Sequence, residues 1–471
     1  MNLARCSAPL FVWTLAVGLG ASPGRAQVDG DLDPSFFPPN GSGVALLYLG
    51  QPNFFSDTVK ATVVQPDGKI VVETSSILPG GDSAVGILRF NPDGSTDLGF
   101  ANNGVAYFQL NGYTGPGGLL LQPDGRIVVG GTAPQSSDST IFVGRLTASG
   151  LLDTTFNPPW GYTTFDFYSQ NPGSYGEGLA AMALQTDGKI VLAGDLVPGT
   201  NRDMGVARLN GDGSVDTAFG GQLCGCTSVA FDLGGTLNDY ARAVAIDADG
   251  NIVVAGEAHW GSNDFDWAIF RLTPGGLLDT SFNSTGSEIL PWDLSPESTD
   301  IPSRIATLPG GRFVVGGTAT VDEQGTTFVH AVLARFGAGG GLDPTFGPGV
   351  HPGQCTQLAA QLNADHVGLA ADAHGELWVG YETTFAYGAT RLDADCQPVF
   401  PIVTGGQTFD VLENGFGDLV VGPDQRVVIT GTTYGAFPGY RYVGALRLWV
   451  AELFRDGFES ANTSRWSSTA P

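Results

Sequence analysis

One short hairpin-like sequence recurs along this chain, and it constrains the fold more than any other feature. Residues 119–131 read LLLQPDGRIVVGG, and other versions read VVQPDGKIVVE, MALQTDGKIVLAG, VAIDADGNIVVAG and IATLPGGRFVVGG. Each version has two apolar runs separated by a turn whose residues supply a positive or preset φ. Because a unit repeated at a regular period buries its apolar faces against its neighbours, we expect a repeat architecture.

A second signature follows each hairpin and fixes the period of the repeat. It reads LRFNPDGSTDLGF, GRLTASGLLDTTF, ARLNGDGSVDTAF, FRLTPGGLLDTSF and ARFGAGGGLDPTF. Its arginine persists in two degenerate copies near the end of the chain. The seven arginines are Arg89, Arg145, Arg208, Arg271, Arg335, Arg391 and Arg447, and successive members are 56, 63, 63, 64, 56 and 56 residues apart. The chain therefore contains seven similar units.

Each unit has room for four short strands. In the second unit we expect strands at 117–122, 126–131, 141–146 and 162–167. Runs such as KIVV are apolar without alternation, which is typical of strands covered on both faces. A sheet stacked between two similar sheets meets that requirement, and helical signals are nearly absent. The sequence thus predicts an all-β, seven-bladed β-propeller of four-stranded antiparallel blades rather than a β-helix, whose coils are shorter.

The two ends of the repeat region complement each other. Residues 28–36, VDGDLDPSF, match the second half of the signature without a hairpin before them. The last unit has its hairpin, VVGPDQRVVITG, and Arg447, but no LDxxF afterwards. We expect a strand at 43–48 to complete the seventh blade, which closes the ring and removes two exposed sheet edges.

These motifs resemble a known family. LQPDGRIVVGG, followed by the pattern R-L-x-x-D-G-x-L-D-x-x-F, is similar to the delta-60 repeat of exported bacterial proteins. The resemblance covers roughly residues 28–450. It implies export and a propeller-forming scaffold, and it implies no catalytic residues.

The first 26 residues are typical of a secretory signal peptide. A basic Arg5 precedes an apolar run over about residues 8–21, and small residues stand at Gly24 and Ala26. The run is too short to span a membrane stably. We expect domains at 1–26 (signal peptide), 27–455 (propeller) and 456–471, a tail that is either a sorting or retention segment or a frayed end. The mature protein would be secreted, extracellular or at the cell surface, with the periplasm as an alternative.

The charge of the chain limits its partners. Its net charge is −26, and removal of the leader, which holds two arginines and no acidic residue, makes it −28. Such a field repels nucleic acid. We expect no membrane span, a monomer, and a partner that is an extracellular protein or a polysaccharide.

Four cysteines remain after the leader, and an exported chain permits disulfides between them. Cys355 and Cys396 lie in one poorly conforming unit and are the first candidate pair. Cys224 and Cys226 are separated by one glycine, a spacing that we expect to be too tight for an easy mutual bridge. Paired ligands for zinc are absent from the sequence.

Arginine and aspartate recur eight residues apart around the second turn of five units. Across an antiparallel hairpin the two side chains would face each other and fix its register. A ring of charged ligand contacts is the functional alternative. The pairs are Arg89–Asp97, Arg145–Asp153, Arg208–Asp216, Arg271–Asp279 and Arg335–Asp343, and the phenylalanines expected as core plugs between blades are Phe100, Phe156, Phe219, Phe282 and Phe346.

We expect no cofactor, with a structural calcium ion as the alternative. Residues 247–251, DADGN, resemble the opening of a calcium loop. Positions six and twelve of that loop are Ile252 and Ala258, where glycine and glutamate are needed. A hairpin turn stabilised by the Asp247 side chain is therefore the favoured interpretation.

The candidate ligand-binding residues lie in two aromatic connections, 257–267 and 431–442. They are His259, Trp260, Tyr434, Phe437 and Tyr440.

The sequence has no nucleophile elbow, zinc-protease motif or phosphate loop. We expect a non-enzymatic scaffold that binds its partner through the face of the variable connections. A hydrolase or lyase acting on an extracellular polymer at the channel mouth, and a purely structural envelope protein, are the alternatives. Carboxylates with perturbed pKa values in a funnel would favour the enzyme, and a flat aromatic patch would favour binding.

Overall fold

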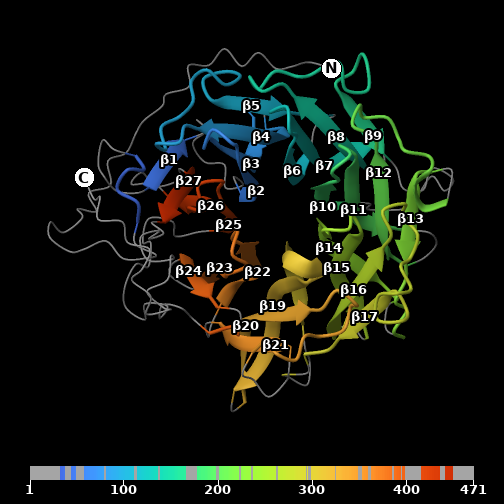
Figure 1. The fold of residues 1–471 in the computed structure, drawn as a ribbon. Helices are drawn as coiled ribbons and strands as arrows, with labels where there is room; N and C mark the ends of the chain where they lie inside the picture. Colours follow the sequence, from blue (N-terminus) through green and yellow to red (C-terminus); the bar gives the residue numbers. More distant parts are fainter. Residues whose placement is uncertain are drawn as a thin grey trace, which may run out of the picture.

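Seven antiparallel sheets surround a central channel (Figure 1). The structure is a computed structural model that describes residues 32–448 with internal gaps, the longest at 49–57, 166–177 and 398–414. The predicted seven-bladed β-propeller is confirmed. Within the described residues, regular helical structure is limited to the two short 3₁₀ turns η1 (Phe219–Gly221) and η2 (Pro309–Gly311).

The strands follow one another through the blades in chain order. Blades 1 and 2 comprise β2 (Thr58–Val64), β3 (Ile70–Ile77), β4 (Ser83–Phe90), β5 (Val105–Phe108), and β6 (Gly115–Leu121), β7 (Ile127–Gln135), β8 (Asp138–Leu146), β9 (Tyr162–Phe165). Blades 3 and 4 comprise β10 (Leu179–Leu184), β11 (Ile190–Leu196), β12 (Asp203–Leu209), β13 (Cys226–Val229), and β14 (Asp239–Ile246), β15 (Ile252–His259), β16 (Phe265–Leu272), β17 (Ser287–Leu290).

The remaining blades continue the order. Blade 5 comprises β18 (Ile301–Thr307), β19 (Phe313–Glu323), β20 (Thr326–Phe336) and β21 (Gln354–Leu358). Blade 6 has three strands among the described residues, β22 (Leu362–Ala371), β23 (Leu377–Thr383) and β24 (Tyr387–Leu392), and its expected fourth strand lies outside them. Blade 7 comprises β25 (Phe416–Val421), β26 (Val427–Tyr434), β27 (Arg441–Leu448) and β1 (Val44–Tyr48).

The N-terminal strand closes the ring. β1 pairs antiparallel with β27, in a register that runs from Val44 opposite Leu446 to Tyr48 opposite Tyr442. Upstream of β1, the Arg447 guanidinium donates through Nε to Asp33 Oδ2 at 2.8 Å, across 414 residues of sequence. The beginning of the chain therefore supplies both the outer strand and the missing half of the signature, as predicted.

The first strand of each blade lies nearest the channel. First strands of neighbouring blades contact one another around the ring, β2 with β6, β6 with β10 and so on to β25 with β2. Figure 1 shows β2, β6, β10, β14, β22 and β25 near the centre, and β5, β9, β13, β17 and β21 at the rim. Side chains on the first strands therefore decide the chemistry of the channel.

Each signature phenylalanine fills the space between its own blade and the next. Phe100 is fully buried, and it packs against Gly150 in the following blade so closely that a Cβ there would lie 2.6 Å from its ring. Gly150 also has φ +84°, so both the backbone conformation and the lack of space for a Cβ require glycine there. The same contact recurs at Phe156 with Gly213, Phe219 with Gly276, Phe282 with Gly340, and at the closing seam at Phe36 with Gly94.

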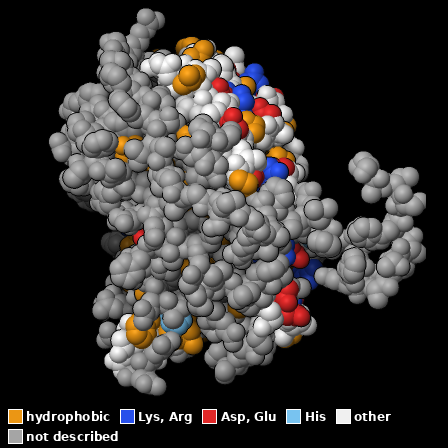
Figure 2. Space-filling view, turned by 90° about the vertical axis from the view of Figure 1, so that its left-hand side faces the viewer, with side chains coloured by type: hydrophobic (Ala, Val, Ile, Leu, Met, Phe, Trp, Pro, Cys, Tyr) orange, Lys and Arg blue, Asp and Glu red, His pale blue; other side chains and the backbone are white. Residues whose placement is uncertain are grey.

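Several basic side chains on the outside of the blades are paired with acidic ones. Figure 2 shows basic and acidic side chains side by side on the described part of the surface that faces the viewer. The lysines Lys69 and Lys189 illustrate this, because each contacts an aspartate, Asp97 or Asp216, at 3.0 Å. Outside the channel, therefore, these bases serve the fold.

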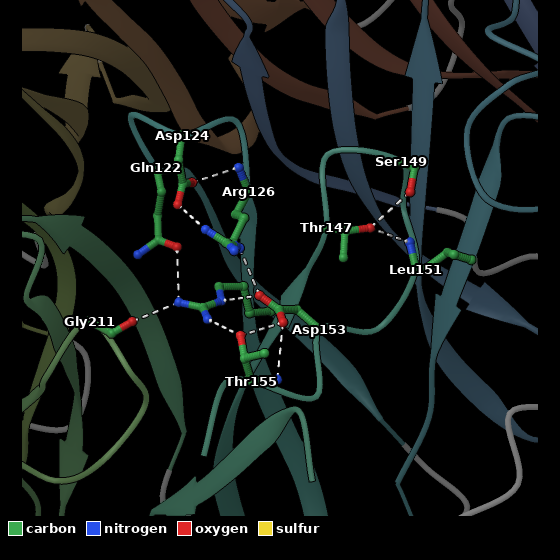
Figure 3. A network of polar contacts seen from close by, with 10 residues as sticks. Gln122, Asp124, Arg126, Thr147, Ser149, Leu151, Asp153, Thr155 and Gly211 are labelled. Carbon is green, nitrogen blue, oxygen red and sulfur yellow. Dashed lines mark hydrogen bonds and ion pairs between the residues drawn. The ribbon is translucent and has the colours of Figure 1, made fainter. Parts of the chain in front are cut away.

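The structure brings each predicted Arg–Asp pair together and shows what the pair does. In blade 2, Arg145 Nε donates to Asp153 Oδ2 at 2.8 Å, and Arg145 Nη1 donates to the carbonyl of Gly211 in blade 3 at 2.7 Å (Figure 3). Its guanidinium also stacks over Phe156, 4.9 Å from the ring centroid. The other four arginines contact their aspartates at 2.8 to 2.9 Å in the same way. These side chains tie a hairpin to its own blade and to the next.

Both cysteine pairs are disulfide-bonded. Cys355 is joined to Cys396. Cys224 is joined to Cys226, so the expectation that this spacing is too tight was wrong. Gly225 has φ +65°, which folds the chain back and leaves the two Cα atoms 5.2 Å apart. That distance is within the range of ordinary disulfides.

Two expected segments cannot be placed. The leader at 1–26 and the tail at 456–471 lie outside the described residues. Among the described residues, no helix has the length and apolar character needed to cross a membrane.

Candidate functional site

The strand order gives the propeller two different faces. The turns between the first and second strands and between the third and fourth strands lie at one end of each blade, where Gly68 packs against Pro92. The opposite end carries the connections between the second and third strands and between blades. We call this end the connection face. The first strand of each blade starts at the connection face.

Each first strand carries a β-bulge near its start. The pairing of first and second strands shifts register between residues 59 and 61 in blade 1 and at the corresponding place in blades 2, 3, 4, 5 and 7, and in blade 6 it shifts between Leu362 and Val367. A bulge leaves one residue unpaired and redirects side chains. The ring of bulges therefore forms a collar around the channel near the connection face.

Three basic residues stand on this collar. Lys60 and Arg242 are the bulged residues of blades 1 and 4, and Arg304 follows the bulged Ser303 of blade 5. At the same two positions the other blades have Gly117–Gly118, Ala180–Ala181, Val367–Gly368 and Gly417–Asp418. The collar thus has three bases and one acid, in a chain whose net charge is −26.

The basic residues line a pocket at the collar. It has a volume of about 170 Å³ and is bordered by Lys60, Arg242 and Arg304, by Asp195 of β11, and by apolar or small residues at the starts of β10, β14 and β18. Its walls come from blades 1, 3, 4 and 5. Because these residues lie near the strand starts, the pocket belongs to the connection-face half of the channel.

Arg304 connects three blades across the channel. Its Nη2 lies 3.3 Å from Asp418 Oδ1 in blade 7 and donates to the carbonyl oxygen of Lys60 in blade 1 at 3.4 Å. The second oxygen of Asp418 accepts the backbone N–H of Thr62 at 2.9 Å. These contacts hold the collar together, and they partly neutralise Arg304.

Arg242 is held by acidic residues behind the pocket. Its Nη2 donates to Glu257 Oε1 at 2.7 Å, and the second oxygen of the buried Glu257 has no hydrogen-bond partner. Burial raises the pKa of the Asp195 carboxyl to about 6, against the opposing charges of Arg202 and Arg242. This side of the pocket therefore contains a carboxyl group that titrates close to neutral pH.

Glu73, on the second strand of blade 1, is an unusual carboxyl group close to the collar. It is fully buried on β3, and neither carboxylate oxygen makes a regular hydrogen bond. Burial raises the pKa of Glu73 to about 8, although the Lys60 ammonium and the backbone N–H groups of Gly118 and Gly117 oppose the shift. Burial, followed by the Arg304 guanidinium, lowers the pKa of Lys60 to about 8. At neutral pH, Glu73 is therefore mostly a neutral acid beside a cationic Lys60.

Sequence reasoning missed this collar, although the repeat contained its signal. Glu73 stands where the second strands of other blades have Gly130, Ala193, Ala255, Gly316, Gly380 and Thr430. This position packs against the next blade, and glycines at 117 and 118 leave room for the larger Glu73 side chain. A residue-by-residue alignment of the seven units would have exposed Lys60, Glu73, Arg242 and Arg304 as departures from the pattern.

The predicted aromatic residues do not form one patch among the described residues. Trp260 follows β15 in blade 4 and is 52% exposed, whereas Tyr434 ends β26 in blade 7. Phe437 and Tyr440 lie outside the described residues. His259 packs on Phe265, with ring centroids 4.0 Å apart, and burial and then Arg242 lower its pKa.

Residues 247–251, which resemble the opening of a calcium loop, form the side-chain-stabilised turn that the sequence favoured. Asp247 Oδ1 accepts the backbone N–H groups of Asp249 and Asn251 at 2.9 and 2.8 Å. In the part of the chain that the structure describes, no three His, Cys, Asp or Glu side chains gather in a way that could hold a metal ion.

The collar can perform two kinds of chemistry. Two guanidinium groups and an ammonium group can hold an anion, because charge-assisted hydrogen bonds are strong where water is limited. Lys60 and Asp195 can also exchange protons near neutral pH. These are properties of convergent titratable groups rather than of a flat aromatic patch.

Comparisons with known proteins agree with the architecture. Residues 65–100, 122–156, 185–219 and 248–282 match the family model described as "Domain of unknown function (DUF5122) beta-propeller". These segments run from the first turn to the signature phenylalanine in blades 1 to 4. The match supports a β-propeller family, and a search of curated proteins found no match.

Solved structures with a similar chain path include proteins of several kinds. The β-propeller domain of the Trilobed protease from Pyrococcus furiosus is 10% identical, with a TM-score of 0.42, and the match covers 83% of this chain and 96% of that domain. Polysaccharide lyase Uly1 is 10% identical, with a TM-score of 0.45 and coverage of 86% and 92%. A glucose dehydrogenase is 13% identical, with a TM-score of 0.40 and coverage of 86% and 98%. Likeness at this level identifies no chemistry for this chain.

Proposed function

We propose that this chain is an exported delta-60-type propeller that binds a carboxylate-bearing ligand at the collar, through the connection face. One observation carries the proposal: an acidic protein places three basic side chains around one pocket in its channel. Clefts in which one sign of charge predominates concentrate ions of the opposite sign, and here three bases outnumber the one acidic residue, Asp195, that borders the pocket. The ligand class that fits is therefore an organic anion.

The size of the pocket favours a small acid. An engineered cavity of about 150 Å³ holds one benzene molecule, so a pocket of about 170 Å³ has room for about six non-hydrogen atoms. A larger extracellular partner, such as an acidic polysaccharide, would insert one carboxylate and leave the rest on the connection face. Trp260 would then contact that remainder.

Calorimetric titration with lactate and lactamide tests the proposal, because the two ligands share a shape and differ in charge. We expect the wild-type protein to bind lactate and not lactamide. Arg242→Gln and Arg304→Gln should each weaken lactate binding about tenfold, as expected for the loss of one charge-assisted hydrogen bond. Arg312→Gln is the matched control, because Arg312 is exposed at a turn on the opposite face. Equal binding of lactate and lactamide, or equal weakening by Arg312→Gln, would refute the proposal.

Catalysis at the same collar is the second candidate. The raised pKa values of Glu73 and Asp195 favour it, because active sites commonly keep acids and bases near neutrality. A hydrolase or lyase acting on an acidic polymer would release shorter products from oligogalacturonate. Measurable binding without such products would support the binding function and exclude catalysis of this reaction.

A further inference from the structure

The use of lysine in this chain is selective. The sequence has three lysines among its 21 basic residues. Lys69 and Lys189 follow the glycine of the first turn, where other blades have Arg126, Arg312 and Arg426, and both are ion-paired. Lys60 is the one lysine outside this register, and it lines the collar pocket.

Charge alone does not explain a lysine at this place. The other two basic positions of the collar are arginines, and a guanidinium provides more hydrogen bonds to a carboxylate than an ammonium does. What lysine adds is the ability to lose its proton and act as a nucleophile. The amine at position 60 therefore offers a reaction that Arg242 and Arg304 cannot.

The surroundings of Lys60 favour the free amine. Burial is the main cause that lowers the pKa of Lys60 to about 8, and the positive charges of Arg304 and Arg242 act in the same direction. Glu73 and Asp418 act in the opposite direction. Glu73 is mostly protonated at neutral pH, and Asp418 is engaged by Arg304 and by the Thr62 N–H.

We propose that Lys60 forms an imine with the carbonyl group of a small 2-oxo acid whose carboxylate is held by Arg242 and Arg304. The inference rests on the proposed anion-binding function and narrows its ligand class. The lone pair of the neutral Nζ attacks the carbonyl carbon, the C=O π electrons move to the oxygen, and a proton passes through solvent from the nitrogen to that oxygen to give a carbinolamine. The C–O bond then breaks: the hydroxyl group takes a proton from solvent and leaves as water, and the nitrogen lone pair forms the C=N bond. The resulting iminium ion releases its N–H proton to solvent to give the imine. No oxidant or reductant is needed.

Borohydride trapping with pyruvate tests the inference. Reduction converts an imine into a stable secondary amine, and peptide mapping distinguishes the three lysines without ambiguity. We expect the adduct on Lys60 to exceed that on Lys69 or Lys189 by about tenfold or more, the factor that corresponds to one unit of pKa. Arg304→Gln should reduce the adduct on Lys60, and Arg312→Gln should not.

Two further measurements separate the possible failures. Lys60→Arg keeps the positive charge but removes the amine, so it should give no adduct in the 58–64 strand. Lactate binding to the wild type together with equal labelling of all three lysines would overturn the imine and leave the proposed function standing. No lactate binding and no selective adduct would overturn both.

Discussion

Glu73 shows how one residue can depart from a repeat without disturbing it. Five of the other six blades have glycine or alanine at this position, because the next blade packs against it. Blade 2 compensates with Gly117 and Gly118, which present no side chain to the carboxyl group. The carboxyl is accommodated sterically, but it has lost its water without gaining regular hydrogen bonds. That loss of hydration is the cause of its raised pKa.

The pH dependence of stability tests this description of Glu73. The folded protein keeps the proton up to about pH 8, whereas the unfolded chain releases it near 4.5. Between these values the folded state binds more protons at Glu73, so the contribution of Glu73 to stability is greatest below pH 4.5 and falls as the pH rises toward 8. Glu73→Gln removes this loss. We expect the melting temperature of the variant, relative to wild type, to be higher at pH 8 than at pH 5.

The titration of Lys60 does not interfere with this measurement of melting temperatures at pH 5 and pH 8. Its pKa falls from 10.5 to about 8, so its influence on stability changes between about pH 8 and 10.5. A difference between Glu73→Gln and wild type that is the same at pH 5 and pH 8 would show that Glu73 is ionised in the folded protein.

At the scale of the element, the turn glycines have two structural functions that can be separated. A turn glycine supplies a positive φ, and in the second turn of several blades it also makes room for the phenylalanine of the preceding blade. Gly150 and Gly188 separate the two functions, because both have φ +84°. A Cβ at Gly150 would lie 2.6 Å from Phe100, and one at Gly188 would meet nothing within 4 Å.

Alanine substitutions at these two glycines should therefore differ. We expect Gly188→Ala to destabilise the protein by about 1–2 kcal/mol, the cost of the left-handed conformation. Gly150→Ala should cost about 1–3 kcal/mol more, because it also overpacks the contact with Phe100. Urea unfolding of the two variants measures the difference. Equal losses would mean that the space between blades adapts freely.

The strands and turns could be predicted because the same sequence pattern recurs in seven units. The strands expected at 117–122, 126–131, 141–146 and 162–167 are found at Gly115–Leu121, Ile127–Gln135, Asp138–Leu146 and Tyr162–Phe165. The turn residues predicted well the strand ends that lie next to the turns. The ends at the connection face were predicted less well because the variable connections carry no pattern, and β7 and β8 extend several residues further toward that face.

The site could not be predicted in the same way. Averaging over units reveals the core and hides Lys60, Glu73, Arg242 and Arg304, each of which differs from its counterparts. The bulges next to Lys60, Arg242 and Arg304 leave no mark in a single unit, and Glu73 lies on a second strand, outside these bulges. The aromatic residues of the connections attracted attention instead, although Trp260 and Tyr434 belong to blades three places apart in the ring.

At the scale of the whole molecule, the collar exists only in a closed ring. Its side chains come from blades 1, 3, 4, 5 and 7, and Arg304 and Asp418 interact across 114 residues of sequence. Blade 7 is completed by β1, and Asp33 and Phe36 add an ion pair and a core plug at the same seam. A ring that opened between blades 7 and 1 would separate Asp418 from Thr62 and Lys60, and the pocket would lose its shape.

The most direct test of the account is a disulfide across the seam. Ala45 and Ala445 are fully buried and directly opposite each other in β1 and β27. We expect the double variant Ala45→Cys/Ala445→Cys to form an intramolecular disulfide, identified by peptide mapping without reduction. The control Ala45→Cys/Ala268→Cys, whose second cysteine lies in blade 4, should not form one. Efficient linkage of the first pair alone would establish the closed ring that assembles the collar. A folded protein in which residues 45 and 445 fail to link would contradict it.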